Sequence, residues 1–355
     1  MPVTIVVGGQ YGSEGKGKVA ALLASRARAP WLVRCGGPNS GHTVSIDDKE
    51  IVLRQVPSCA DSDPRNVTFC IAAGCAVEES ILLTEVEMLG IQRERIIVDP
   101  RAVVVTEEDR EVERSQLTEI GSTCSGTGAA LVRRMSRRTG VLLVQHSATL
   151  KARCRIESVA PLLHDAIDAG EEVVVEGTQG FGLSIYHGPH YPFVTARDTT
   201  AAGFAMEVGL SPRLVDRIVM VLRTFPIRVG GPSGPFLNET SWEEIKVLSG
   251  APEPVPEYTS VTHRLRRVAH FDIQAVRTAC SYNRPTSLAV MGLDRLDYQV
   301  TRATDPRALS ETAKRFLQEL NRSTGIQVQF GGTGFRTRDV VEMPVATGRD
   351  ILTHE

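Results

Sequence analysis

The chain of 355 residues has no excess of positive charge, since 40 Lys and Arg residues stand against 42 Asp and Glu residues. Proteins that bind DNA or RNA usually carry a basic surface, because they neutralise backbone phosphates. Polymeric nucleic acid is therefore not an expected partner. The local clusters Arg133–Arg134, Arg137–Arg138 and 264–267 better suit small anionic ligands.

Paired cysteines and long hydrophobic runs are also lacking. The seven cysteines are scattered and none forms a CxxC pair, which excludes a disulfide framework or a zinc site and predicts reduced thiols in the cytoplasm. The first apolar run, Val3–Val7, ends in glycine and charge, so it does not read as a signal peptide. No apolar stretch approaches the roughly 20 residues that span a membrane, so no membrane partner is expected.

Short β-branched runs alternate with helix-like stretches, which predicts an α/β fold with a large, mainly parallel central sheet flanked by helices. The predicted strands are Thr4–Val7, Trp31–Val33, Val67–Ala72, Arg95–Val98, Val141–Val144, Glu172–Val175, Ile218–Leu222, Ser287–Met291 and Ile326–Phe330. The predicted helices include Glu79–Leu89, Ser158–Ala169, Phe271–Cys280 and Leu309–Arg322. Residues 230–256, rich in proline and glycine, are interpreted as a loop with a small helix. We expect one domain, residues 1–355, with long functional loops.

The strongest chemical signal is GGQYGSEGKGK, residues 8–18, which stands between a predicted strand and a predicted helix. Glycines let backbone N–H groups approach phosphate oxygens, and the start of the helix adds its dipole. Lys16 supplies a mobile positive charge. Taken alone, the loop could equally be a glycine-rich turn with solvated lysines.

Three further polar, glycine-rich stretches occur at predicted strand ends or in loops. They are RCGGPNSGHTV at 34–44, GSTCSGTG at 121–128 and EGTQGFG at 176–182, the last followed by YPFVTARDTTAAG at 191–203. In a parallel sheet, the loops at one edge converge on a ligand crevice. Several such loops in one chain favour a shared ligand site over unrelated turns.

In this order, these motifs and the R-x-R-R run at 264–267 resemble those of adenylosuccinate synthetases, from residue 3 to about residue 337. The resemblance implies a P-loop-related α/β fold and a homodimer. It implies a carbon–nitrogen ligase that phosphorylates a purine 6-oxygen with a nucleoside triphosphate. The amine of aspartate then displaces the phosphate, with Mg²⁺ as the cofactor.

The resemblance also assigns the donor nucleotide. Lys16 and His42 would stabilise phosphoryl transfer, while Ser13 and the Gly41 carbonyl would lie at the magnesium ion. The complete set implied for ATP is Gly15, Lys16, Gly17, Lys18, Gly41, His42, Thr43, Asp294, Gly332 and Gly334.

The acceptor nucleotide and aspartate are assigned in the same way. The acceptor set is Ser13, Asn39, Ser122, Thr123, Arg137, Gln179 and Thr195, with Thr195 at the 5′-phosphate, Gln179 at the base, and Arg137 reaching across the dimer. The aspartate set is Val229, Val261, Thr262, Arg264 and Arg266. Two arginines suit carboxylates, because guanidinium groups bind them through two parallel hydrogen bonds. Without the family, residues 264–267 would be interpreted as a solvated basic turn.

One departure from the family pattern concerns the acceptor. The usual loop is Gly-Asp-Glu-Gly-Lys-Gly-Lys, and its aspartate binds magnesium and takes the N1 proton of IMP. Here the residue is Ser13, which is a poor base. The chain resembles a phage-encoded branch that carries serine at this position and converts dGMP to the succinyl precursor of 2-aminoadenine deoxynucleotide. The shorter side chain leaves room for the 2-amino group of guanine, and its hydroxyl can accept a hydrogen bond.

A second departure concerns the donor. Gly292 replaces the lysine of the usual Thr-Lys-Leu-Asp, although Asp294 remains. The loss of a long apolar stem over the base favours ATP or dATP over GTP. Together the departures predict a ligase for dGMP, L-aspartate and ATP in the cytoplasm, or the host cytoplasm if phage-encoded. The alternatives are an ordinary synthetase acting on IMP and an inactive nucleotide sensor. The N1 proton could pass to Glu14, a water held by Ser13, or a substrate phosphate oxygen.

Overall fold

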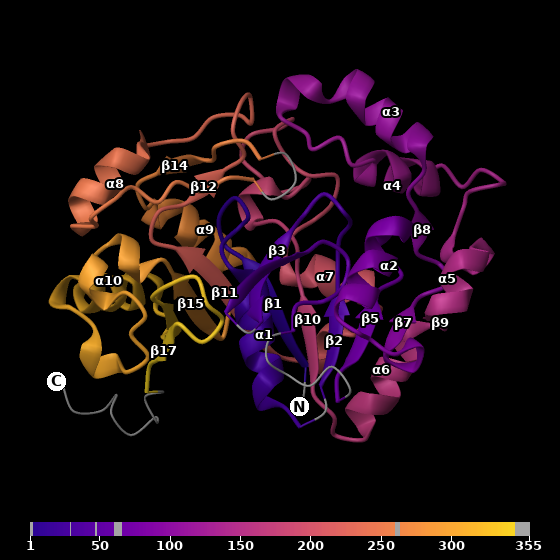
Figure 1. Ribbon diagram of the computed structural model, residues 1–355, viewed down its shortest axis with the longest axis horizontal. Helices are drawn as coiled ribbons and strands as arrows, with labels where there is room; N and C mark the ends of the chain where they lie inside the picture. The colour runs from indigo at the N-terminus through magenta and orange to yellow at the C-terminus, as the bar shows by residue number, and fades with distance from the viewer. Residues whose placement is uncertain (1–2, 29, 47, 60–65, 260–262, 345–355) are drawn as a thin grey trace.

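The computed structural model describes residues 3–28, 30–46, 48–59, 66–259 and 263–344 (Figure 1). Its centre is a ten-stranded sheet. The spatial order is β17 (Val340–Glu342), β16 (Val328–Gly332), β15 (Ser287–Met291), β11 (Val215–Arg223), β1 (Val3–Gly8), β10 (Val173–Glu176), β2 (Trp31–Arg34), β5 (Thr68–Ile71), β7 (Ile96–Val98) and β9 (Arg155–Ile156). Neighbouring strands are parallel, except that β17 is antiparallel to β16. The predicted α/β class with a mainly parallel sheet is confirmed.

Smaller sheets and the helices complete the fold. The smaller sheets pair β3 (His42–Ile46) with β4 (Lys49–Leu53), β6 (Ala76–Val77) with β8 (Val103–Val104), and β14 (Arg267–Ala269) with both β12 (Ile227–Arg228) and β13 (Glu239–Thr240). The α-helices are α1 (Lys16–Arg26), α2 (Glu79–Met88), α3 (Glu107–Gln116), α4 (Thr127–Met135), α5 (Ala148–Arg153), α6 (Val159–Asp168), α7 (Ala201–Val208), α8 (Trp242–Ser249), α9 (Ile273–Asn283) and α10 (Glu311–Thr324).

Most predicted elements are present with shifted ends, but the strand predicted at Val141–Val144 is wrong. Leu143 makes only an isolated bridge to Val103, and Val144 begins a short 3-10 helix that ends at His146. Val141 and Leu143 instead pack against a small apolar cluster beside β8 and α4. A four-residue apolar run can either pack on an apolar cluster or form a strand of a sheet. Its composition is the same in both cases and therefore did not decide between them. Residues 230–256 contain the small helix α8, as expected.

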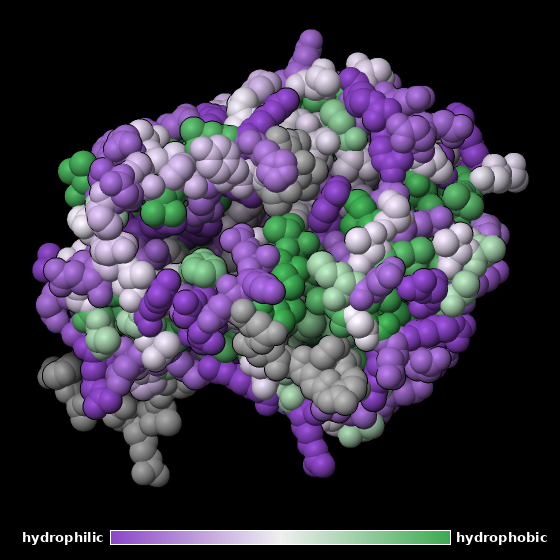
Figure 2. All heavy atoms as spheres, viewed as in Figure 1, coloured by the Kyte–Doolittle hydropathy of each residue, from purple (hydrophilic) through white to green (hydrophobic). Residues whose placement is uncertain are grey.

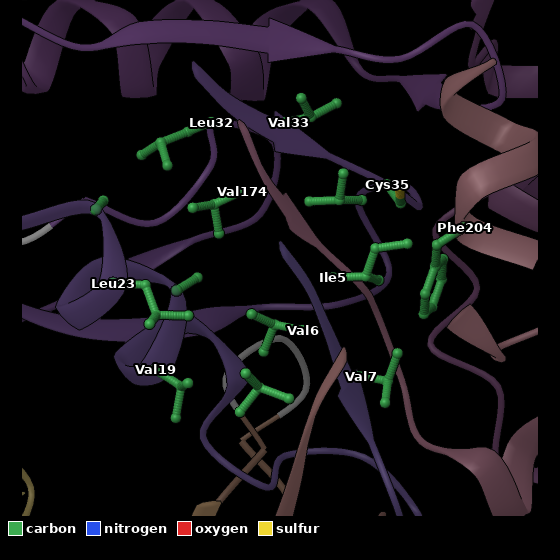
Figure 3. Packing of buried hydrophobic residues seen from close by; sticks show 14 of the residues in the cluster. Ile5, Val6, Val7, Val19, Leu23, Leu32, Val33, Cys35, Val174 and Phe204 are labelled. Carbon is green, nitrogen blue, oxygen red and sulfur yellow. The ribbon is translucent and has the colours of Figure 1, made fainter. Parts of the chain in front are cut away.

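The core lies on both faces of β1. Ile5 and Val7 point towards Phe204 of α7, whereas Val6 points towards Leu23 of α1 (Figure 3). Successive strand residues face opposite sides of a sheet, so an unbroken apolar run requires cover on both faces. Both helices contact β1, and the whole strand is buried. This packing holds the loop between β1 and α1 at one edge of the sheet.

Parallel pairing brings the glycine-rich loops together. Strands β2, β10 and β1 are adjacent and end at Arg34, Glu176 and Gly8, so the loops that follow leave the same edge of the sheet. Helices α3 and α4 lie side by side near the top of Figure 1, while α8, β12 and β14 lie on the other side of the top. The face shown in Figure 2 is mostly hydrophilic, with separate hydrophobic patches. Within the described residues, none of the helices has the length and apolarity to cross a membrane.

Candidate active site

The glycine-rich loop after β1 is organised from inside by Glu14. This side chain is completely buried, and its Oε1 accepts hydrogen bonds from the backbone N–H groups of Gln10 (3.2 Å) and Gly12 (2.8 Å). Its Oε2 accepts a hydrogen bond from Lys16 Nζ at 2.6 Å. The carboxylate therefore closes the loop and holds the predicted phosphate-binding lysine at the start of α1.

Glycine is needed at two points where α1 begins. Gly15 adopts a φ of 98°, in the left-handed region that favours glycine. A Cβ atom at Gly17 would lie 2.7 Å from Ser58 Oγ and 2.9 Å from His42 Cβ. Real Cβ atoms do not approach other groups that closely, so Gly17 allows α1 to pack directly against His42. This contact joins the first loop to the second.

His42 opens β3 and lies in a buried polar network with Arg34 and Glu176. The latter two residues face each other in the register of β2 and β10, and Arg34 Nη1 donates to Glu176 Oε1 at 3.0 Å. The Nδ1 atom of His42 contacts both of these groups. Ser58 donates its backbone N–H and its hydroxyl to the same carboxylate, at 2.6 and 2.7 Å.

The network controls the charge of His42. Burial and the Arg34 guanidinium lower the pKa of the imidazole to about 4. Burial alone would raise the pKa of Glu176, but the charges and hydrogen bonds of His42 and Arg34 outweigh it and lower that pKa. The Nδ1 atom lies between a donor, Arg34 Nη1, and an acceptor, Glu176 Oε1, so it has a partner in either tautomer of the neutral ring. With the proton on Nε2 the neutral ring donates from that atom and Nδ1 accepts from Arg34, whereas with the proton on Nδ1 the ring accepts at Nε2.

Two residues predicted for the donor, Gly334 and Asp294, lie near Lys18. Its Nζ donates to the carbonyl oxygens of Gly334 and Asp339, both at 2.8 Å. Burial lowers the pKa of Lys18 to about 8, although Asp339 and Asp294 act in the opposite direction. Asp294 and Gly334 follow the adjacent parallel strands β15 and β16, with Gly332 at the end of β16. Lys18 therefore fastens α1 to the loop after β16, a contact that the sequence did not reveal.

A cavity of about 860 Å³ lies beside the loops that were predicted to bind the acceptor. Its lining includes Asn39, Ser122, Thr123, Gln179, Thr195 and Val229, so it unites most of the predicted acceptor residues with one predicted aspartate residue. Ser13 and Arg137 are not among its lining residues, whereas their neighbours Tyr11 and Arg138 are. Arg137 follows α4 and is exposed. Hydroxyl and amide groups converge here, as a nucleotide site requires.

The predicted aspartate loop is closed at its base. Thr259 donates its backbone N–H to the Arg264 carbonyl at 2.8 Å, and the Arg264 N–H donates to Thr259 Oγ1 at 2.9 Å. Below this closure, the Arg266 N–H donates to the Glu257 carbonyl at 2.8 Å. The Arg264 side chain is exposed, and burial lowers the pKa of Arg266. Val261 and Thr262, also predicted for aspartate, lie outside the described residues.

Along most of its length the chain is similar to proteins of one known family. The chain matches the family described as Adenylosuccinate synthetase over residues 5–155 and 143–301. It belongs to the adenylosuccinate synthetase family. The adenylosuccinate synthetase of Methanocaldococcus jannaschii is 39% identical over 346 residues, 96% of each chain. That of Pyrococcus sp. (strain ST700) is 36% identical over 348 residues, 96% of this chain and 98% of the other.

Two solved structures share the fold. Fully ligated adenylosuccinate synthetase from Plasmodium falciparum superposes with a TM-score of 0.85 at 19% identity, covering 97% of this chain and 100% of the other. Cyanophage S-2L succinoaminodeoxyadenylate synthetase (PurZ), bound to dGMP and to dATP as energy donor, gives a TM-score of 0.81 at 27% identity. That comparison covers 97% of this chain and 96% of the other.

Sequence reasoning missed three charged residues that contact residues of the predicted site. Arg34 and Glu176 are fully buried beside His42, and Arg223 lies against Ser13. A weak signal was present, because each of the three is a charged residue at the end of an apolar strand. The sequence alone does not show which strands are neighbours, so it could not pair Arg34 with Glu176.

Proposed function

We propose that the protein joins L-aspartate to C6 of dGMP. ATP is hydrolysed to ADP and phosphate, and the product is 2-amino-2′-deoxy-N6-succinyladenylate, a precursor of 2-aminoadenine DNA. The observation that carries this proposal is Ser13, which stands in the phosphate loop where the family usually has an aspartate. The cyanophage enzyme described with dGMP and dATP supports it.

The donor phosphates bind to the loop before α1 in this proposal. Lys16 and the backbone N–H groups of residues 15–18 hold the triphosphate, and His42 stabilises the phosphoryl group in transfer. Phosphoryl transfer is accelerated mainly by positioning and by fixed charges and dipoles, so a buried, oriented network suits the reaction. The contacts from Glu176 and Arg34 to His42 support this role.

Magnesium fits this loop only as a partner of substrate phosphates. Ser13 and the Gly41 carbonyl offer neutral oxygen atoms, while the neighbouring carboxylate of Glu14 is turned towards backbone N–H groups and Lys16. Mg²⁺ commonly keeps several waters and binds phosphate oxygens, so a small protein contribution is chemically reasonable. When bound, the ion would neutralise charge on the transferring phosphoryl group.

The acceptor occupies the large cavity in this proposal. Asn39, Thr123 and Thr195 hold the nucleotide, with Thr195 at its 5′-phosphate, and Gln179 binds the base beside Ser13. The backbone of Gly12 supports the last assignment, because a Cβ there would lie 3.6 Å from Gln179 Oε1. Ser13 makes room for the 2-amino group and accepts its hydrogen bond.

We infer that the working unit is a homodimer in which Arg137 reaches the partner's acceptor nucleotide. Helix α4, which precedes Arg137, exposes Val132 by 66% and Met135 by 69%. Large exposed apolar side chains at neighbouring positions are typical of protein interfaces. They support α4 as part of a subunit contact beside the cavity.

The contacts of Glu14 bear on the N1 proton. Its two oxygen atoms already accept three hydrogen bonds within the loop, one of them from a lysine, so both are committed to holding the loop. We therefore favour a water held by Ser13 or a substrate phosphate oxygen. Either route replaces the carboxylate that the family usually provides.

A second candidate substrate is IMP, because the archaeal relatives at 36–39% identity are named adenylosuccinate synthetases. Phosphate release with ATP should be measured for dGMP and for IMP, with and without aspartate. We expect turnover with dGMP to exceed that with IMP by at least roughly tenfold, about 1.4 kcal/mol. Equal rates or a preference for IMP would reject dGMP as the substrate. Binding without turnover of either nucleotide would identify a sensor instead.

A further inference from the structure

Arg223 occupies an unusual place between the phosphate loop and the aspartate loop. It is the last residue of β11, and its Nη1 donates to the Ser13 carbonyl at 3.0 Å. Its backbone N–H donates to Gln10 Oε1 at 2.8 Å, and its carbonyl accepts from Gln10 Nε2 at 3.1 Å. Both the side chain and the backbone of Arg223 thus hold the loop that contains Ser13.

The other end of the guanidinium reaches the aspartate loop. Arg223 Nη2 donates to Glu257 Oε1, and the Glu257 carbonyl accepts the backbone N–H of Arg266 just below the closure of that loop. The same carboxylate lies 3.9 Å from Nη2 of Arg295, whose Nε is 3.7 Å from Asp294. A hydrogen bond between Arg223 and the Ser13 carbonyl is thus followed by ion pairs from Arg223 to Glu257, from Glu257 to Arg295 and from Arg295 to Asp294, a residue predicted for the donor site.

The backbone at Ser13 needs such support. Its φ of 56° lies in the left-handed region, which non-glycine residues adopt at a cost and keep only when their surroundings hold them. The hydrogen bond from Arg223 to the Ser13 carbonyl supplies that restraint. It acts on the residue that we assign to acceptor recognition.

The interactions of Arg223 are not those expected of a residue that serves only to stabilise the fold. Its Nε is buried and has no hydrogen-bond partner among the described residues. A buried N–H without a partner costs free energy, and apolar side chains often replace buried ion pairs without loss of stability. An arginine here is better explained by the two loops that it joins.

We propose that Arg223 is a positioning residue that couples the aspartate loop to Ser13 of the phosphate loop. Aspartate binding and acceptor binding then strengthen each other, because each orders one end of the same guanidinium. The proposal rests on the proposed function for the roles of the loops. It does not depend on whether the acceptor is dGMP or IMP.

The test compares Arg223→Met, which removes the donors but keeps a long side chain, with Glu257→Gln, which weakens the same link from its other end. Arg315→Met, on the exposed surface of α10, is the matched control. Aspartate affinity is measured by calorimetry with ADP and Mg²⁺, without an acceptor and with saturating dGMP or IMP. The wild type and the control should bind aspartate more tightly when the acceptor is present.

We expect both Arg223→Met and Glu257→Gln to reduce this acceptor-dependent gain by at least about tenfold. The thermal unfolding midpoint of each variant is also measured, because a large decrease would show that the substitution has damaged the fold. If Arg223→Met does not fold, the result for Glu257→Gln decides. An unchanged gain in a folded variant would overturn the proposal, and so would an equal loss of aspartate affinity with and without the acceptor. A failure with dGMP alone, with coupling intact for IMP, would count against the proposed substrate and not against the coupling.

Discussion

Glu176 and Arg34 form an ion pair of 3.0 Å at the ends of neighbouring parallel strands, and both side chains are almost fully buried. The register of β10 and β2 places the two residues opposite each other. His42 contacts both, although it belongs to a different strand. A buried pair of this kind is costly to break, because one charge would remain without its partner. The orientation of His42 therefore depends on the alignment of two strands.

Replacing Glu176 with glutamine should lower kcat and leave the KM values nearly unchanged. The amide cannot supply the negative charge beside His42, and a charge-assisted hydrogen bond contributes about 1.5–3 kcal/mol, or roughly 10–100-fold in rate. Steady-state kinetics with each substrate varied provide the measurement. Glu172→Gln, on the exposed surface just before β10, is the control. A normal kcat in Glu176→Gln would contradict a role in orienting His42.

Replacing Ser13 with aspartate should shift the ratio of the two kcat/KM values from dGMP towards IMP. The longer side chain crowds the 2-amino group of guanine and restores a magnesium ligand and base suited to IMP. Ser13→Ala keeps the space and should lose only about 0.5–1.5 kcal/mol, the worth of one neutral hydrogen bond. A larger loss in the alanine variant would give the hydroxyl a role in holding metal or water. An unchanged ratio in Ser13→Asp would show that Ser13 does not determine specificity.

The reaction rate with ATP or dATP as the phosphate donor should be at least as high as the rate with GTP. Gly292 lacks the stem that would cover a guanine base, and it adopts a φ of 84° that disfavours any longer side chain. Its carbonyl accepts a hydrogen bond from Thr224 Oγ1 at 2.6 Å, which fixes the turn before Asp294. Initial rates with a panel of ATP, dATP and GTP are the appropriate measurement. A strict requirement for GTP would mean that Asp294 suffices to select guanine.

The KM for the donor should rise as the pH increases through about 8. The pKa of Lys18 falls from 10.5 to about 8 in the folded protein, so the ammonium is present below that pH and lost above it. Loss of this charge weakens the hydrogen bonds from Lys18 to the carbonyl oxygens of Gly334 and Asp339. Kinetics between pH 7 and about 9.5 would follow the change, with the KM of the acceptor as an internal control. A donor KM that is constant across this range would argue against the role of Lys18.

Arg137 should complete the active site of the partner subunit. Mixed dimers of Arg137→Ala and Lys16→Ala should recover part of the wild-type activity, because one of their two sites contains both original residues. Each variant alone should have little activity. Subunit exchange must first be verified, for example with differently tagged chains. Absence of recovery after exchange would reject a site shared between subunits.

Local patterns in the sequence were sufficient to predict the class of fold, which the structure confirms, and they led to the prediction of a phosphate loop. Apolar runs such as Val3–Val7 require cover on both faces, which points to a parallel sheet with helices on each side. Glycines at positions 12, 15 and 17 beside Lys16 indicate a phosphate loop. This pattern lies within one short segment, so it can be recognised without knowing the tertiary structure. The strand predicted at Val141–Val144 was wrong because a short apolar run can either join a sheet or pack on a cluster. Which of the two happens depends on segments that are distant in the sequence, so the run itself does not decide it.

By itself, the sequence determined the family, the α/β architecture and the unusual residue Ser13. Only the tertiary structure decided what surrounds these residues: the pairing of Arg34 with Glu176 against His42, the attachment of Lys18 to the loop after β16, and the link from Ser13 through Arg223 to Glu257. Each of these contacts joins residues from separate strands or loops. The order of strands in the sheet sets their distances, and spacing along the chain does not contain that order.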